Sequence, residues 1–233
     1  MITKTITENT LYLDVETCGA YPTLDEAREK DPVLADLWEK RCKWLKKNVD
    51  EDESVTPEDL WKNRSSLHPE FGKIICVSFG VFTSTGDEKI TSFFGDDEKD
   101  ILEKTNKILQ NSRGKGFNIG GLNIKNFDIP YIGKRMLANK INPDSSIQSW
   151  NKKPWELSYV DLGDIFSFGA WGQSFSSLEL ISHILGIDSS KDKMNGSDVH
   201  ESYWNKGKIE DIKEYCEKDV LCTMKCFKEI SDL

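Results

Sequence analysis

Apolar and polar residues alternate along "LYLDVET", residues 11–17, near the start of the chain. Alternation with a period of two is typical of a β-strand, in which successive side chains point to opposite faces. The pattern places Asp14 and Glu16 on one face, opposite Leu13 and Val15. Two neighbouring carboxylates repel each other unless water or a cation separates their charges. The alternation therefore predicts either a solvated strand edge or a metal ion at this pair.

Strand-like and helical patterns follow one another along the rest of the chain. Residues 20–66 carry apolar residues at near-helical spacing, and we interpret them as a helical insertion after the first strand. The apolar run 73–82 predicts a central strand, and "TGD" leads from it into a hairpin partner, "EKITSFFG". The other predicted elements are a helix over 97–111, a strand in "GKGFNIGG", a strand end leading into a helix in "NFDIPYIGKRMLANK", a strand around 160–162, a helix in "SFSSLELISHILGI" and a helix over 208–230. This order predicts an α/β sheet with helices on its faces.

The composition, 37% hydrophobic and 30% charged over 233 residues, is that of a soluble globular protein. We expect a single domain over residues 1–233. A net charge of −9 argues against sequence-independent coating of nucleic acid, which needs a basic surface, but it allows a small site neutralised by metal. The sequence shows neither the apolar core of a signal peptide nor a membrane-spanning run, so we expect a cytoplasmic protein without membrane contact.

The six cysteines include no CxxC pair, and the chain has only three histidines, so a zinc site has little support. We interpret the thiols as reduced and structural. Cys222 and Cys226 lie one helical turn apart and would be either a metal-binding pair or two small buried residues. The buried interpretation is favoured.

Carboxylates recur in three separated segments with apolar surroundings. Asp14 and Glu16 are followed by Asp128 in "NIKNFDIPYI" and by Asp219 in "EYCEKDVLC". Each acid alone would be interpreted as solvated surface, but four acids gathered by one fold need divalent cations such as Mg²⁺ or Mn²⁺. Two such ions about 4 Å apart can hydrolyse a phosphodiester. Tyr215 precedes Asp219 by one helical turn, so its phenol shares that face and is able to orient the attacking water.

Three motifs carry a family resemblance. "LDVET", "NIKNFD" and "YCEKD" resemble, in order and spacing, the motifs of the DEDDy branch of DnaQ-like 3′→5′ exonucleases. The similarity spans most of residues 9–230 and is greatest to proteins related to the proofreading domain of family B DNA polymerases. It implies an RNase H-like fold, a mixed five-stranded sheet flanked by helices. The histidine branch needs a histidine five residues before the last aspartate, where this chain has Glu214, so the tyrosine branch is favoured.

The resemblance also implies catalytic and metal-binding roles. Asp14 would bridge two Mg²⁺ or Mn²⁺ ions, and Glu16 and Asp219 would complete the shell of the ion that holds the attacking water. Asp128 would support the second ion. Tyr215 would position the nucleophile.

Five further residues correspond to substrate contacts in the family. Thr17, Cys18 and Gly19 would hold the terminal nucleotide, and Asn123 and Phe127 would contact its sugar or the last base. A strand-ending turn is an alternative interpretation for Cys18 and Gly19. Phe127 is instead slightly favoured as a core residue.

Two tryptophan-containing segments leave alternatives open. "EKRCKWLKK", residues 39–47, would either hold a single strand by stacking and charge or place Trp38 and Trp44 in the core, and the core is favoured. Trp171, in a glycine-rich loop, would either stack on substrate or anchor its loop.

The sequence thus predicts a 3′→5′ exonuclease that acts on a nucleic-acid 3′ end, with single-stranded DNA preferred, in proofreading, replication or repair alongside a separate DNA polymerase. One alternative is an exoribonuclease of the same fold. Others are a non-catalytic nucleic-acid-binding or polymerase-clamping module, or a cation site without turnover. The four acids together with Tyr215 favour the enzyme.

Overall fold

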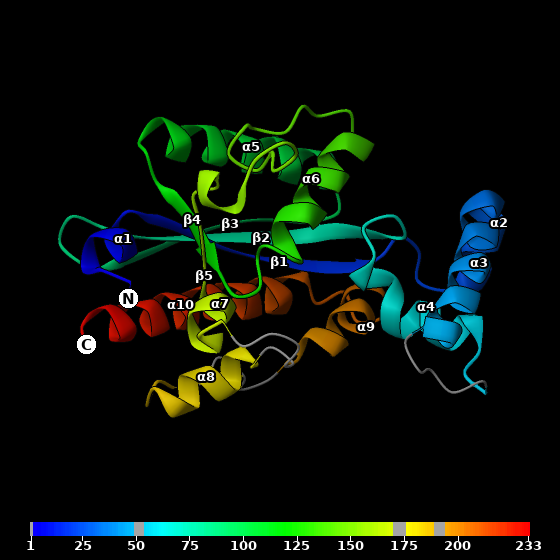
Figure 1. Cartoon of the computed structure of the whole chain (residues 1–233). Helices are drawn as coiled ribbons and strands as arrows, with labels where there is room; N and C mark the ends of the chain where they lie inside the picture. The colour runs from blue at the N-terminus through cyan, green and yellow to red at the C-terminus, as the bar shows by residue number, and fades with distance from the viewer. Residues whose placement is uncertain (1, 49–53, 170–175, 189–193) are drawn as a thin grey trace.

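The computed structural model describes residues 2–48, 54–169, 176–188 and 194–233. In this part of the chain five strands form one mixed sheet in the order β3-β2-β1-β4-β5 (Figure 1). Strand β1 is antiparallel to β2 and parallel to β4, while β2–β3 is antiparallel and β4–β5 parallel. The strands are β1 (Thr10–Gly19), β2 (Gly72–Phe82), β3 (Glu88–Phe94), β4 (Asn118–Gly121) and β5 (Tyr159–Asp161). The predicted α/β class and mixed five-stranded sheet are confirmed.

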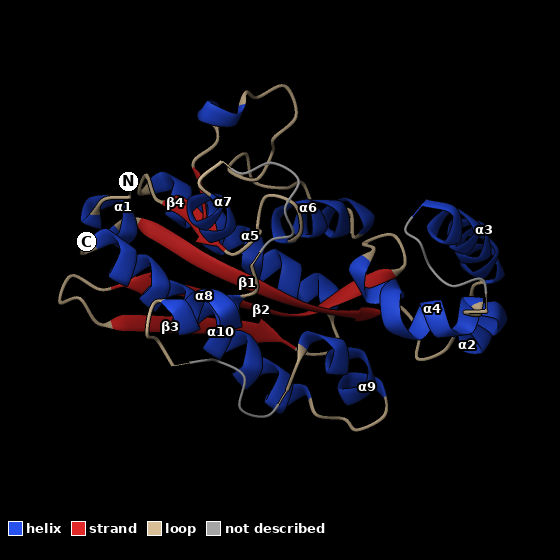
Figure 2. Cartoon of the chain, turned by 60° about the horizontal axis from the view of Figure 1, so that its bottom comes forward, coloured by secondary structure: helices blue, strands red, loops and turns tan. Residues whose placement is uncertain are grey.

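Most of the described helices cover the two faces of the sheet, and α2, α3 and α4 form a lobe beside it; the bounds of all of them follow. They are α1 (Lys4–Glu8), α2 (Leu24–Lys30), α3 (Pro32–Asn48), α4 (Pro57–Arg64), α5 (Glu98–Gly114), α6 (Asp128–Ala138), α7 (Leu162–Ser167), α8 (Leu178–Ile184), α9 (Val199–Trp204) and α10 (Ile209–Ser231). Helices α5 and α6 lie on one face, and α10 lies along the other with α8 and α9 beside it (Figures 1 and 2). None of the described helices has the length and apolar character needed to cross a bilayer.

Strand β1 separates two apolar clusters, as its alternation predicts. Leu13 and Val15 belong to the cluster beneath α5 and α6, whereas Tyr12 packs with residues of α10. The pairing register between β1 and β2 shifts after Glu16, so that Thr17 pairs with Ile74. Asp14 and Glu16 precede this shift and share the face of Tyr12, so they lie on the side of the sheet that α10 covers.

Helices α2, α3 and α4 form the lobe at the right of Figure 1, between β1 and β2 in sequence. Their shared cluster contains Trp38, which is fully buried and meets Trp61 edge-on at 5.4 Å between ring centroids. Trp44 lies on the same helix but is 49% exposed. The core interpretation is therefore confirmed for Trp38 and wrong for Trp44.

The structure differs from the predicted elements at several points. Helices α1 and α9 were not expected, because five or six residues are too few to show helical periodicity. The predicted strand end in residues 126–127 is wrong: β4 ends at Gly121 and a loop leads to α6. All six cysteines are buried free thiols, and both Cys222 and Cys226 pack in the apolar cluster beside α10. Trp171 lies outside the described residues.

Candidate active site

Asp14 and Glu16 point from β1 toward α10, where they meet Cys216. A carboxylate oxygen of each acid and the sulfur of Cys216 lie within 4.8 Å of one another. Glu16 is only 7% exposed, and Asp14 is partly buried. The predicted pair of strand acids is thus drawn into the interior, away from a solvated edge.

Asp128 approaches the pair from the neighbouring edge of β1. Strand β4 pairs with β1 only as far as Tyr12, so the next part of this edge has no strand partner in β4. The N–H of Val15 there donates a hydrogen bond of 3.1 Å to Oδ1 of Asp128, the first residue of α6. Since Val15 stands between Asp14 and Glu16, this bond fixes the third acid beside the first two.

Tyr215 and Asp219 reach the cluster from α10. They are one turn apart on this helix, as the spacing predicts. Burial is the main cause that raises the pKa of Tyr215 above its usual range, followed by the charges of Asp219 and Glu16. The phenol therefore stays protonated at neutral pH.

The four carboxylates are close enough to oppose each other's ionisation. Burial is the largest cause that raises the pKa of Asp14, and Asp128 and Asp219 raise it further. Burial also raises the pKa of Glu16, followed by the charges of Asp14 and Asp219. Burial raises the pKa of Asp128 to about 7 against the hydrogen bonds that lower it. These are hard oxygen donors gathered in a confined site, and such a set fits Mg²⁺ or Mn²⁺.

Two cysteines at the cluster were missed by sequence reasoning. Cys76 on β2 pairs with Glu16, and Cys216 donates a hydrogen bond of 3.4 Å from its thiol to Oδ2 of Asp14. This bond lowers the pKa of Asp14. The position of Cys216, three residues before Asp219 on a helix, was a usable signal because residues so spaced share a face.

Asp161 is a third missed residue and organises the loop before Asp128. It is 2% exposed and accepts hydrogen bonds from the N–H groups of Asn123 at 2.8 Å, Lys125 at 3.2 Å and Gly163 at 2.9 Å. Asn123 has a left-handed backbone, with φ of 56°. The carboxylate thus holds the turn that brings the chain from β4 to Asp128.

The turn after β1 is held by side chains from the C-terminal part of the chain. The N–H of Gly19 donates to Nδ1 of His200 at 3.0 Å, and its carbonyl accepts from Nε1 of Trp204 at 3.0 Å. Cys18 is fully buried. Cys18 and Gly19 are the last two residues of β1, paired with Lys73 and Gly72, so the chain bends only after them. Their contact with substrate stays a prediction.

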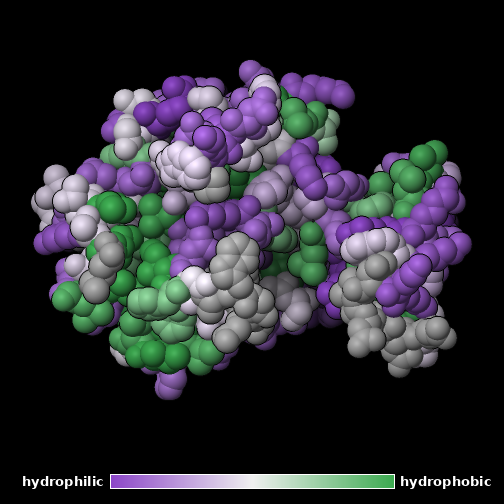
Figure 3. All heavy atoms as spheres, in the orientation of Figure 1, coloured by the Kyte–Doolittle hydropathy of each residue, from purple (hydrophilic) through white to green (hydrophobic). Residues whose placement is uncertain are grey.

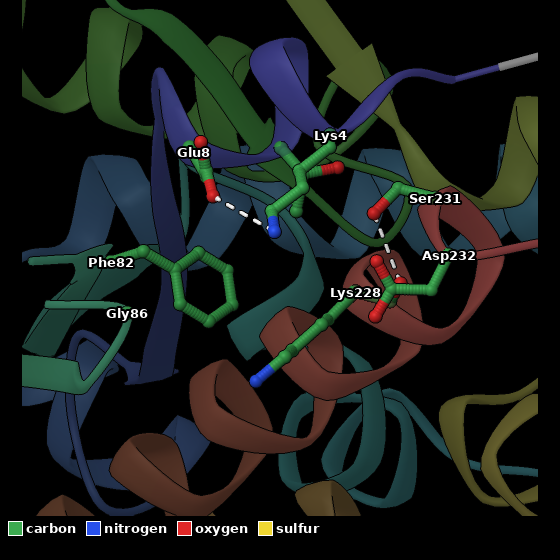
Figure 4. A pocket seen from close by; sticks show the side chains of 8 residues that line it. Lys4, Glu8, Phe82, Gly86, Lys228, Ser231 and Asp232 are labelled. Atoms are coloured by element: carbon green, nitrogen blue, oxygen red, sulfur yellow. Dashed lines mark hydrogen bonds and ion pairs between the residues drawn. The ribbon is translucent and has the colours of Figure 1, made fainter. Parts of the chain in front are cut away.

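A separate small cavity lies far along α10 from Tyr215. About 100 Å³ in volume, it is enclosed by α1, the loop after β2 and the C-terminal end of α10. Figure 4 shows Lys4 and Glu8, whose charged atoms are 3.9 Å apart, beside Phe82 and Lys228. Its lining includes no member of the acidic cluster, so it is not a candidate for the same chemistry.

Fold and site together define an α/β protein of the RNase H-like type, with acids on the central strand and on two flanking helices. The family model described as "predicted 3′-5′ exonuclease related to the exonuclease domain of PolB" matches residues 65–231, more than half of the chain, and the chain belongs to this family. Asp128, Tyr215 and Asp219 lie within the matched residues. Asp14 and Glu16 precede them, and the fold joins the two strand acids to the rest.

A solved structure supports the fold. The family B DNA polymerase from the hyperthermophilic archaeon Pyrobaculum calidifontis is similar with a TM-score of 0.56 and 15% sequence identity. The similarity covers 95% of this chain and 24% of the polymerase chain, so this chain spans about a quarter of that protein. The search of curated proteins gave no match. The predicted relationship to the exonuclease domain of family B polymerases is confirmed.

Proposed function

We propose that this chain is a metal-dependent 3′→5′ exonuclease that hydrolyses phosphodiester bonds at the 3′ end of single-stranded DNA. The observation that carries the proposal is the convergence of four carboxylates and Tyr215 from β1, α6 and α10 on one buried cluster. Membership of the exonuclease family supports the same reaction class.

Asp14, Glu16, Asp128 and Asp219 would hold two Mg²⁺ or Mn²⁺ ions. When bound, such ions activate a water molecule and stabilise the negative charge that develops on the phosphate and the leaving oxygen. The protein's own part is to hold four carboxylates together in the interior, which it does by hydrogen-bonding Asp128 to the backbone of β1 and Asp14 to Cys216.

Tyr215 would orient the attacking water. Because its raised pKa keeps the phenol protonated, the hydroxyl is able to donate a hydrogen bond to the water oxygen and to leave a lone pair aimed at the phosphorus. Thr17, Asn123 and Phe127 are proposed to contact the terminal nucleotide. Thr17 lies beside Glu16, and Phe127 lies beside Asp128, so both are next to the proposed metal ligands.

The DNA substrate is proposed from the relationship to a DNA polymerase domain, and a role in proofreading or repair with a separate polymerase follows from it. A time course tests this function with purified protein and Mn²⁺ on single-stranded DNA, duplex DNA and RNA, each labelled at the 5′ end. We expect a descending ladder, fastest on single-stranded DNA. The Asp14→Ala variant, purified in parallel, controls for a contaminating nuclease. Faster digestion of RNA would indicate an exoribonuclease. The absence of product from every substrate would favour a non-catalytic nucleic-acid-binding module.

A further inference from the structure

A groove of about 830 Å³ runs between α3 and α6, with the segment 67–71 between them. In Figure 3 the surface is hollowed between the body of the molecule and the lobe that contains α3. Its volume is within the range of pockets that enclose a drug-sized ligand. The chemistry of the α3 and α6 walls therefore indicates what kind of ligand fits the groove.

Helix α3 has one face packed in the core of the lobe, and another face forms a wall of the groove. Leu37, Arg41 and Trp44 follow the spacing i, i+4, i+7 and line the groove, whereas Trp38 and Cys42 face the core of the lobe. Leu37 is 48% exposed and Trp44 49%. An exposed stripe of large side chains beside a groove marks a binding surface.

The chemistry of this wall combines an aromatic ring with cations. The guanidinium carbon of Arg41 lies 4.2 Å from the centroid of the Trp44 ring. Lys40 on α3 and Lys134 on α6 add two positive charges to that of Arg41. Glu70 is the acidic residue among the described residues that line the groove. Lys40 pairs with Asp36 at 2.6 Å and Lys134 with Glu70 at 2.8 Å. Both are exposed pairs, which are weak, so a phosphate can compete for either lysine.

The groove begins beside the acidic cluster. Phe127, in the α6 wall, directly precedes Asp128, and its ring lies 5.4 Å from that of Tyr131. On the other side, the hydroxyl of Thr17 donates to the carbonyl of Ser66 at 2.8 Å, and the next residue, Leu67, lines the groove. A polymer whose 3′ end reaches Asp14 and Glu16 has this groove as an adjoining surface.

We infer that the α3–α6 groove binds single-stranded DNA upstream of the 3′ terminus, with a base stacked on Trp44 and phosphates held by Arg41, Lys40 and Lys134. Stacked aromatics and a basic track are the means by which proteins hold single strands. The local positive charge suits a phosphate backbone, although the whole chain carries −9. This inference rests on the proposed function and extends it to a substrate track between α6, inside the matched family region, and α3, which precedes that region.

A binding experiment tests the track without hydrolysis. The full chain in EDTA and low salt is titrated into a 5′-fluorescein single-stranded DNA of about twelve nucleotides, within the site sizes of such proteins. We expect Trp44→Ala to weaken binding about tenfold by anisotropy. Arg41→Gln should weaken it as well and make the slope of log K against log salt shallower by about 0.7, the value for one single-strand phosphate. Unchanged thermal denaturation confirms that each variant is folded.

The chain supplies a matched control in Trp155. It is 76% exposed and has Lys153 at 5.1 Å from its ring, the same kind of cation–aromatic pair outside the groove. Trp155→Ala should bind like the wild type. The proposal that the groove binds DNA would be contradicted if Trp155→Ala lost binding and Trp44→Ala did not, or if the wild type did not bind at all. A larger effect of Trp44→Ala on an RNA strand than on DNA would overturn the choice of DNA.

Hydrolysis provides the second readout. On long single-stranded DNA Trp44→Ala should raise KM with little change in kcat. On a dinucleotide, which would occupy only the end of the groove beside Asp128 and not extend to Trp44, it should match the wild type. If the wild type binds DNA through Trp44 but hydrolyses none of the substrates, the proposed exonuclease function is refuted, whereas DNA binding by the groove is supported. If Trp44→Ala binds DNA like the wild type and has the wild-type KM on long DNA, DNA binding by the groove is refuted and the proposed function is not.

Discussion

The backbone N–H of Val15 donates a 3.1 Å hydrogen bond to Oδ1 of Asp128 and so ties the start of α6 to the strand between Asp14 and Glu16. Asp128 is therefore both an acceptor that fixes two elements and a charge in an acidic cluster. The substitution Asp128→Asn separates the two, because the amide oxygen can accept the same bond while the charge is lost.

The first prediction concerns pH and metal-free stability. An acid whose pKa is raised by folding binds more protons in the folded state, so the free energy of unfolding falls as pH rises from about 4 toward the folded pKa. That folded value is about 7 for Asp128, and Asp14 and Glu16 shift in the same direction. In EDTA the wild type should thus melt at a lower temperature at pH 8 than at pH 5.5, and Asp128→Asn should melt a few degrees higher than the wild type at pH 8. Equal or lower melting of the variant at every pH would contradict the raised pKa of the buried Asp128 carboxyl.

The second prediction concerns metal. A ligand that binds only the folded state stabilises it by about 2.7 kcal/mol at a hundred times its dissociation constant. Saturating Mn²⁺ at pH 8 should therefore raise the melting temperature of the wild type by several degrees. Asp14→Ala should show little of this rise. A rise of the same size in both proteins would indicate that the cation binds elsewhere.

The third prediction concerns the acids in catalysis. Asp14→Ala and Asp219→Ala should each lower Mn²⁺-stimulated digestion of a labelled oligonucleotide by at least about a hundredfold, since even the loss of groups that support metal ligands costs tenfold to a hundredfold. Far-ultraviolet circular dichroism should show that the fold persists, because each change relieves buried repulsion. Full activity in either variant would refute the two-metal assignment.

The fourth prediction separates Tyr215 from the metal ligands. Tyr215→Phe keeps the ring and removes one hydroxyl, so hydrolysis should slow by about tenfold, the value of one well-placed hydrogen bond. Single-turnover rates at saturating Mn²⁺ measure the step, and the Mn²⁺ concentration for half-maximal activity should stay the same. An unchanged rate would remove the water-orienting role.

The fifth prediction concerns Asp161, which accepts hydrogen bonds from the loop before Asp128. Asp161→Ala leaves the N–H groups of Asn123, Lys125 and Gly163 without their acceptor, and should lower the free energy of unfolding by at least about 2 kcal/mol. More Mn²⁺ should be needed for half-maximal activity, because Asp128 is no longer firmly placed. Asp161→Asn keeps one oxygen acceptor and should recover most of both losses. Wild-type stability and Mn²⁺ requirement in Asp161→Ala would show that the loop is held by other contacts.

Much of the fold and most of the acidic cluster follow from short-range pattern. The two-residue period of β1 places Asp14 and Glu16 on one face, and the helical period of α10 places Tyr215 with Asp219. These relations hold within one element, so they can be derived before any packing is known. Short helices such as α1 and α9 escape the same reasoning because they span fewer than two turns.

Relations between elements were decided by the tertiary structure. The alternation of "LYLDVET" showed that two acids share a face, but only the sheet order leaves the Val15 N–H available to Asp128 beyond the end of β4. Trp38 and Trp44 lie on one helix and are the same residue type, yet one is buried and the other half exposed. The sequence alone determined which side chains share a face of each element; packing decided which face became core, which became groove and which acids met, because those outcomes depend on contacts between segments far apart in the chain.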